Sequence, residues 1–135
     1  MKTASFFTYN GPGRVSIARY APRYTPAGYE TFQDLEPGPW FRSVTWDRYV
    51  EMYQREVLGK LDPQKTFDAL QKLGLGAEPI LLCWEKPPFE GDNHCHRRLV
   101  ADWFGEKLGI NVPELIPPPK PSRRKGVSLP LDFDP

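Results

Sequence analysis

Two short motifs carry the side chains of this sequence that are best suited to chemistry. Cys83 and Glu85 close an apolar run, and Cys95, His96 and Arg97 stand side by side further along the chain. A thiol is a nucleophile, an imidazole transfers protons near neutral pH, and a guanidinium binds anionic groups. These residue types predict Cys95 as a nucleophile or polar contact and His96 as a general acid or base. Glu85 is expected to orient His96 or to hold a sugar hydroxyl.

The elements around the two motifs place them at one edge of a sheet. Residues 79–84 form a continuous apolar run, which predicts a central strand of a covered and usually parallel sheet. A helix is expected over residues 93–108, ended by Gly109. The motifs then lie at the carboxyl end of a strand and in the first turn of a helix, where open α/β sheets bind ligands and helix N-termini attract anions. We therefore expect Arg97 and its neighbour Arg98 to attract an anionic group there.

Helical periodicity gives the second motif an orientation. At about 100° per residue, His96 falls in the middle of the inward apolar face of its helix. That face consists of Leu99, Val100, Trp103 and Phe104. A buried polar ring needs a hydrogen-bond partner, and Glu85 or Cys83 is the predicted one. Two structural interpretations stay open, namely His96 as a satisfied core histidine and Cys83 as an ordinary buried residue. Cys95 is the better functional candidate, because a helix N-terminus beside cationic neighbours stabilises a thiolate.

The N-terminal region is predicted to supply two strands and a long loop. Residues 5–9 and 14–19 have the composition of strands on either side of a strong turn at residues 10–13. They form either a hairpin or neighbours in a mixed sheet whose turn faces a ligand, with Asn10 as a contact. Residues 20–40 hold many Pro and Gly residues and little periodicity, which predicts a long irregular loop of the kind that often carries function.

This region also contains candidate ligand contacts of two kinds. Arg19 and Arg23 are expected to assist Arg97 in binding a phosphate. Tyr20, Tyr24 or Trp40 is expected to stack on a base. Cys83 completes the candidate ligand-binding set from the strand end.

The remaining elements have clear sequence signals. A helix is expected from about Thr45 to Gly59, because apolar residues recur there at helical spacing. The next helix has Asp62 as its N-cap, Pro63 at its first position and Gly74 as its stop. Residues 112–116 are predicted to add a short last strand, and the Pro-rich residues 117–135 an extended or disordered tail. The sequence therefore predicts a small α/β domain over residues 1–116, with a mostly parallel or mixed sheet and flanking helices.

Composition restricts the classes of function. With 18 Lys and Arg against 17 Asp and Glu, the net charge is +1, so anion binding must be local and a nucleic-acid partner is not favoured. No apolar run has the length of a membrane span, and no hydrophobic stretch of a signal peptide follows the first residues. We therefore expect a cytoplasmic protein without a membrane partner, and two cysteines that are both reduced.

Two other interpretations of the cysteines are less favoured. A metal site would use Cys83, Cys95, His96 and His94, but the spacing matches no zinc ribbon or finger. Adjacent residues on a helix also point about 100° apart, which makes joint ligation by Cys95 and His96 awkward. A thiol-redox role lacks a Cys-x-x-Cys motif. Neither a metal nor a cofactor is therefore predicted.

The two motifs together resemble a known family. The segments Leu-Leu-Cys-Trp-Glu-Lys-Pro at residues 81–87 and Cys-His-Arg-Arg-Leu-Val-Ala-Asp-Trp at residues 95–103 are similar to the domain-of-unknown-function family numbered 488. Residues 15–23 resemble its early strand with the following Arg and Pro. The resemblance implies a small α/β fold with a site shared between the motif regions, and no particular activity. Residues 16–19 read Ser-Ile-Ala-Arg where many members have an Asp-Val-Arg type sequence, so no second-strand carboxylate carries over.

Three functions follow from these observations. The leading hypothesis is an enzyme that acts on a nucleotide or a nucleotide-derived phosphorylated small molecule. The second is a protein that binds and sequesters such a ligand without turnover. The third is a nucleic-acid or protein adaptor that uses the basic tail residues Lys120, Arg123, Arg124 and Lys125. A short chain with a shallow crevice is also compatible with a homo-oligomer whose second copy completes the site.

Overall fold

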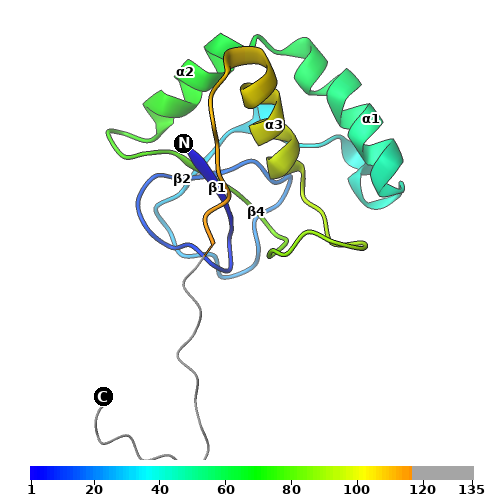
Figure 1. Cartoon of the computed structure of the whole chain (residues 1–135). Helices are drawn as coiled ribbons and strands as arrows, with labels where there is room; N and C mark the ends of the chain where they lie inside the picture. Colours follow the sequence, from blue (N-terminus) through cyan, green and yellow to red (C-terminus); the bar gives the residue numbers. More distant parts are fainter. Residues whose placement is uncertain (117–135) are drawn as a thin grey trace, which may run out of the picture.

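Four parallel strands form the sheet, and three α-helices pack on one of its faces (Figure 1). The computed structural model describes residues 1–116. The strands are β1 (Lys2–Ser5), β2 (Arg14–Ser16), β3 (Glu30–Thr31) and β4 (Ile80–Cys83). The helices are α1 (Trp46–Glu56), α2 (Pro63–Leu73) and α3 (His96–Leu108). The predicted α/β class with a parallel sheet is confirmed.

Strand β4 lies inside the sheet, as its apolar run predicts. The strand order is β1-β4-β2-β3, and β4 pairs with both β1 and β2. Leu81 belongs to the main core, which the three helices cover. Ile80 and Leu82 pack on the other side against Phe6, Tyr9 and Leu115. Loop segments therefore bury the second face of β4, and the predicted flanking helices cover the first.

The N-terminal strands differ from the prediction in position and in pairing. The first strand is Lys2–Ser5, and the Ser5 carbonyl accepts hydrogen bonds from the Thr8 and Tyr9 N–H groups in a turn. A hairpin is excluded because β4 separates β1 from β2 and runs parallel to both. Gly13 allows the turn before β2 to pack closely against the start of β4. Its carbonyl accepts a hydrogen bond from the Ile80 N–H (2.8 Å), and a Cβ at its φ of +81° would collide with the Glu78 carbonyl.

The helix boundaries follow their caps. The Thr45 side chain accepts a hydrogen bond from the Arg48 N–H, and Asp62 accepts one from the Lys65 N–H, so α1 and α2 begin as predicted. Helix α3 begins at His96, later than predicted, because Cys95 has extended backbone angles (φ −144°, ψ 141°) and is its N-cap. It ends at Gly109, whose φ is +66°.

The predicted long loop contains short elements. It holds β3 and two single 3₁₀ turns at Gln33–Leu35 and Pro39–Arg42. The buried Tyr53 hydroxyl of α1 donates to the Leu35 carbonyl (2.6 Å) and fastens the loop to the helix layer. The predicted last strand is reduced to one bridge between Thr3 and Glu114.

The structure bears differently on the predicted tail and on the predicted absence of a membrane span. The predicted tail and its basic residues lie outside residues 1–116. Within the described part, no helix combines the length and apolar character needed to cross a membrane.

Candidate functional site

A cavity of about 340 Å³ opens at the carboxyl edge of β4. This volume lies within the range of roughly 300–1,000 Å³ that small-molecule sites occupy. Its wall is built from the segment after β2, the start of α1, the end of β4 with its following loop, and the start of α3. The lining residues are Ala18, Arg19, Tyr20, Pro37, Phe41, Arg42, Val44, Trp46, Tyr49, Cys83, Trp84, Glu85, Asp92, His94, Cys95 and His96. The two sequence motifs therefore meet in one wall, as their place at the strand end predicts.

The segment after β2 brings cations and flat rings to this cavity. The Arg42 guanidinium carbon lies 4.9 Å from the Phe41 ring centroid and 5.9 Å from that of Tyr20. Arg19 donates one hydrogen bond to the Pro37 carbonyl (3.1 Å), which leaves further N–H groups of its guanidinium for a ligand. Cation–π contacts hold Arg42 beside the rings without using its hydrogen-bond donors.

Carboxylates and a second aromatic group come from the other segments. Glu85 and Asp92 are exposed residues of the loop between β4 and α3. Trp46 stacks on His94 with ring centroids 4.8 Å apart and lies 5.0 Å from Tyr49. Burial, with a smaller contribution from the charge of Glu85, raises the pKa of Tyr49 well above its usual value. Its hydroxyl therefore stays protonated at all physiological pH values.

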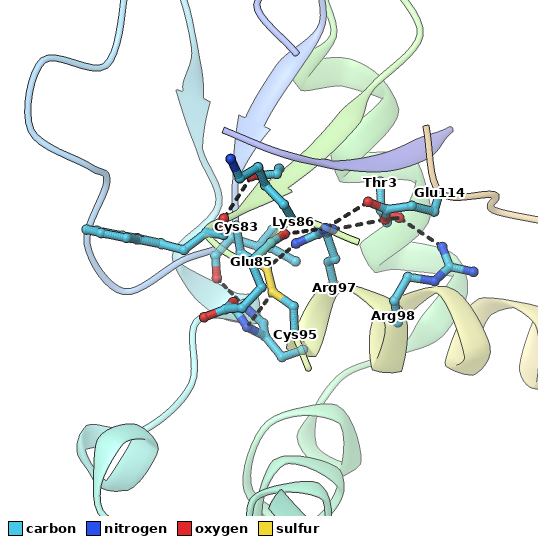
Figure 2. The surroundings of a disulfide bond; sticks show 12 residues. Thr3, Cys83, Glu85, Lys86, Cys95, Arg97, Arg98 and Glu114 are labelled. Atoms are coloured by element: carbon cyan, nitrogen blue, oxygen red, sulfur yellow. Dashed lines mark hydrogen bonds and ion pairs between the residues drawn. A yellow bond between two sulfur atoms is a disulfide. The ribbon is translucent and has the colours of Figure 1, made fainter. Parts of the chain in front are cut away.

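Cys83 and Cys95 form a disulfide in the cavity wall (Figure 2). Cys83 ends β4, Cys95 caps α3, and both are buried. The expectation of two free thiols is therefore wrong for this structure, and Cys95 has no thiolate for nucleophilic attack while the disulfide is intact. The start of α3 packs against the end of β4, which brings the two sulfurs together. The cysteines are 12 positions apart in the sequence, so their spacing did not predict the disulfide.

His96 is held by a backbone carbonyl. Its Nε2 lies 2.7 Å from the Ile17 carbonyl oxygen, so Nε2 carries the proton and donates it. Burial lowers the pKa of His96 to about 4; the hydrogen bond to Ile17 opposes this shift, and the charge of Arg97 adds to it. The ring is therefore neutral at pH 7, with an unprotonated Nδ1 that lies 3.9 Å from the Cys95 sulfur. The prediction that Glu85 or Cys83 orients His96 is wrong.

Arg97 is an internal residue with partners on every nitrogen. Its side chain is 0% exposed. Nε and Nη2 donate to the two carboxylate oxygens of Glu114 (2.9 and 2.7 Å), Nη2 also to the Glu85 carbonyl (2.6 Å), and Nη1 to the Cys83 sulfur (3.3 Å). Figure 2 shows these hydrogen bonds of Arg97, which extend from α3 to Cys83, Glu85 and Glu114. The prediction that Arg97 binds a phosphate is wrong, because the side chain is fully buried and four of its five N–H donors are used inside the protein.

Arg98 belongs to the same internal network. It donates to the Thr3 hydroxyl (2.8 Å) and the Val112 carbonyl (2.9 Å), and Thr3 in turn donates to Glu114 (2.6 Å). Sequence reasoning missed Glu114. The available signal was an isolated carboxylate in a predicted strand after a helix that carries two adjacent arginines.

The other predicted site residues divide into two groups. Arg19, Tyr20 and Glu85 line the cavity, together with Cys83, Cys95 and His96. Asn10, Arg23, Tyr24 and Trp40 do not. Trp40 packs against Tyr49 and donates to Glu56. Sequence reasoning also missed the lining residues at the end of the long loop and the start of α1, where aromatic residues and Arg42 gather.

One group in the described chain has the donor set of a metal site. Ligand atoms of Cys83, Cys95 and His96 all lie within 4.8 Å of one another.

Comparison of the chain with protein-family models, with curated proteins and with solved structures finds no match. The resemblance to the family numbered 488 therefore stays a prediction.

Proposed function

We propose that the cavity binds a nucleotide or a nucleotide-derived phosphorylated small molecule, on which the protein acts as an enzyme. One observation carries this proposal: a cavity of about 340 Å³ has cationic, aromatic and carboxylate groups in a single wall. A nucleotide has matching parts, because its phosphate is anionic, its base has a flat π face and its sugar hydroxyls donate hydrogen bonds.

The groups suited to each part of the ligand come from different segments. Arg19 and Arg42 are suited to the phosphate, in place of the internal Arg97. Tyr20, which is 58% exposed, and the adjacent Phe41 offer ring faces for a base. Glu85 is an exposed acceptor for a sugar hydroxyl or an amino group.

Ligand binding is tested by calorimetric titration with a panel of nucleosides, nucleoside monophosphates and nucleoside diphosphates. Loss of a charge-assisted hydrogen bond costs roughly 1.5–3 kcal/mol, so Arg42→Ala should weaken phosphate-dependent binding about 10- to 100-fold. Arg23→Ala is the matched control, since Arg23 is exposed and lies outside the cavity wall. Equal binding of nucleosides and nucleotides, or equal losses in the two variants, would contradict the proposal.

Turnover is the stricter part of the proposal. With the disulfide closed, the proton acceptors in the cavity wall include the exposed carboxylates of Glu85 and Asp92 and Nδ1 of His96. Glu85 is preferred to the buried His96 because its carboxylate is accessible to a bound ligand, and to Asp92 because it lies two residues after the end of β4. A product that forms with wild-type protein and disappears with Glu85→Gln identifies an enzyme. A ligand that is retained unchanged favours the sequestering protein instead.

A further inference from the structure

The disulfide and the imidazole beside it have a second possible state. We propose that reduction of the Cys83–Cys95 disulfide creates a site for a thiophilic divalent cation such as Zn²⁺, with Cys83, Cys95 and His96 as ligands and the fourth position open to the cavity. The site stands independently of the ligand proposed above. Only a role of the bound cation in a reaction of that ligand would depend on the proposed function.

The positions of the donor atoms support this site. Zinc–sulfur bonds of about 2.3 Å and zinc–nitrogen bonds of about 2.0–2.1 Å place tetrahedral S and N ligands roughly 3.6 Å apart. The Cys95 sulfur and His96 Nδ1 are 3.9 Å apart in the present structure. The objection that adjacent helical residues diverge does not apply, because Cys95 is an extended N-cap outside the helix. Its sulfur turns back toward His96.

His96 already has the arrangement of a metal-bound histidine. Ligating histidines commonly donate their second ring N–H to a backbone carbonyl, which fixes the tautomer and the ring orientation. Here Nε2–H donates to Ile17, so the lone pair of Nδ1 is directed to the sulfur side of the ring. Among the described residues 1–116, the polar contact that this buried nitrogen makes in the disulfide form is with the bonded Cys95 sulfur, at 3.9 Å.

The surroundings of the sulfurs also suit a thiolate pair. Arg97 Nη1 lies 3.3 Å from the Cys83 sulfur and can donate to a thiolate there. The Cα atoms of the two cysteines are 7.0 Å apart, so the sulfurs can separate to ligand spacing by side-chain rotation. Two thiolates and a neutral imidazole balance the charge of Zn²⁺, which is the combination that a buried site tolerates best. Cys83, Cys95 and His96 all line the cavity, so a fourth ligand can enter from it.

The change of state has a defined balance. A dithiol reductant supplies two electrons and two protons, the S–S bond breaks, and the reductant becomes a disulfide. Each cysteine thiol then releases its proton when the cation binds. In the reverse reaction a disulfide oxidant accepts two electrons from the two thiolates and two protons from solvent and becomes a dithiol, while the protein sulfurs rejoin and the cation is released. The disulfide and the bound metal therefore exclude each other.

The first test uses the full chain and a metal ion alone. Protein that has been reduced and freed of metal is titrated with Co²⁺, a spectroscopic substitute for Zn²⁺. We expect one Co²⁺ per chain with a sulfur-to-cobalt charge-transfer band, which Zn²⁺ abolishes and which the oxidised protein never shows. The absence of that band in reduced, folded wild-type protein would overturn the proposal.

Variants and a chemical probe locate the ligands. Cys83→Ser, Cys95→Ser and His96→Ala should each weaken Co²⁺ binding at least tenfold, whereas His94→Ala, at a neighbouring histidine of the same cavity, should leave it unchanged. Protection of both thiols of wild-type protein from alkylation by Zn²⁺ needs no variant and therefore holds even where a substitution prevents folding. Unprotected thiols, or equal losses in the His94 and His96 variants, would contradict the assignment. Nucleotide binding by the oxidised protein is measured separately, so either proposal can fail alone.

Discussion

Two pairs of arginines, Arg97 with Arg98 and Arg19 with Arg42, differ in whether their side chains are used inside the protein or face the cavity. Arg97 and Arg98 stand next to the catalytic-looking Cys-His motif, yet they donate to Glu114, Thr3 and backbone carbonyls inside the molecule. Arg19 and Arg42 come from the segment after β2, away from the Cys-His motif, yet they line the cavity. The comparison teaches that the supply of internal acceptors decides whether a guanidinium is bound inside the fold or left facing the cavity.

The largest expected effect breaks the internal pair. Arg97→Ala leaves the Glu114 carboxylate, whose side chain is 10% exposed, without its bidentate partner. Removal of one partner of a buried ion pair costs about 3–5 kcal/mol, and the free energy of unfolding in urea should fall by that amount. Arg97→Lys is the control that retains the charge and loses the fork, and it should fall between wild type and Arg97→Ala. A loss below about 1 kcal/mol would show that Glu114 finds water as a substitute.

Reduction tests the contribution to stability of the Cys83–Cys95 disulfide, whose Cys83 sulfur accepts a hydrogen bond from Arg97. Cys83 and Cys95 are 12 positions apart, and closure of a loop of this size stabilises a protein by about 3 kcal/mol in the chain-entropy model. A reducing agent, with a chelator present to exclude metals, should therefore lower the melting temperature of the wild-type protein. The Cys83→Ala/Cys95→Ala double variant provides the control, since its melting temperature should not respond to the reducing agent.

Acidification to pH 4 is expected to have an effect of similar size, which acts through His96. Its pKa is about 4 in the folded protein and about 6.5 when unfolded, so only the unfolded chain binds a proton between these values. The stability that the neutral ring contributes is complete above pH 6.5 and decreases as the pH falls toward 4, by roughly 1.4 kcal/mol per unit at most. Urea unfolding of wild type and His96→Gln across this range measures the difference. Parallel pH profiles would show that His96 is not the titrating group.

The smallest effect on stability belongs to the cavity arginines. Arg42 is exposed, and within residues 1–116 its side chain makes cation–π contacts and no ion pair, so Arg42→Ala should change the free energy of unfolding by less than about 1 kcal/mol. The same variant is the one expected to lose phosphate-dependent binding. A large loss of stability without a loss of binding would erase the distinction between the two pairs of arginines.

The parts that could be predicted from the sequence are those fixed by local patterns. Caps and periodicity place α1 and α2, and the apolar run places β4 inside a parallel sheet with the motifs at its end. The pairing of β1 with β4 was not predictable, because Thr3 and Leu81 are far apart in the sequence and nothing local selects that neighbour. The same limit hid Glu114 as the partner of Arg97 and Cys83 as the partner of Cys95. Local rules identified Arg97 and the two cysteines, and tertiary packing decided what each of them contacts.

The central position of β4 has a consequence for the order in which the sheet is made. Both β1 and β2 take their hydrogen bonds from a strand that begins at Ile80. On the ribosome, β1 therefore has no partner until most of the described chain has been synthesised, although β2 and β3 can already pair. Sheets that depend on such distant contacts assemble slowly, because the entropy of a long loop is lost before the contacts form. The emergence of β4 is thus the step that commits the nascent chain to its sheet, and the same strand then delivers Cys83 to the site.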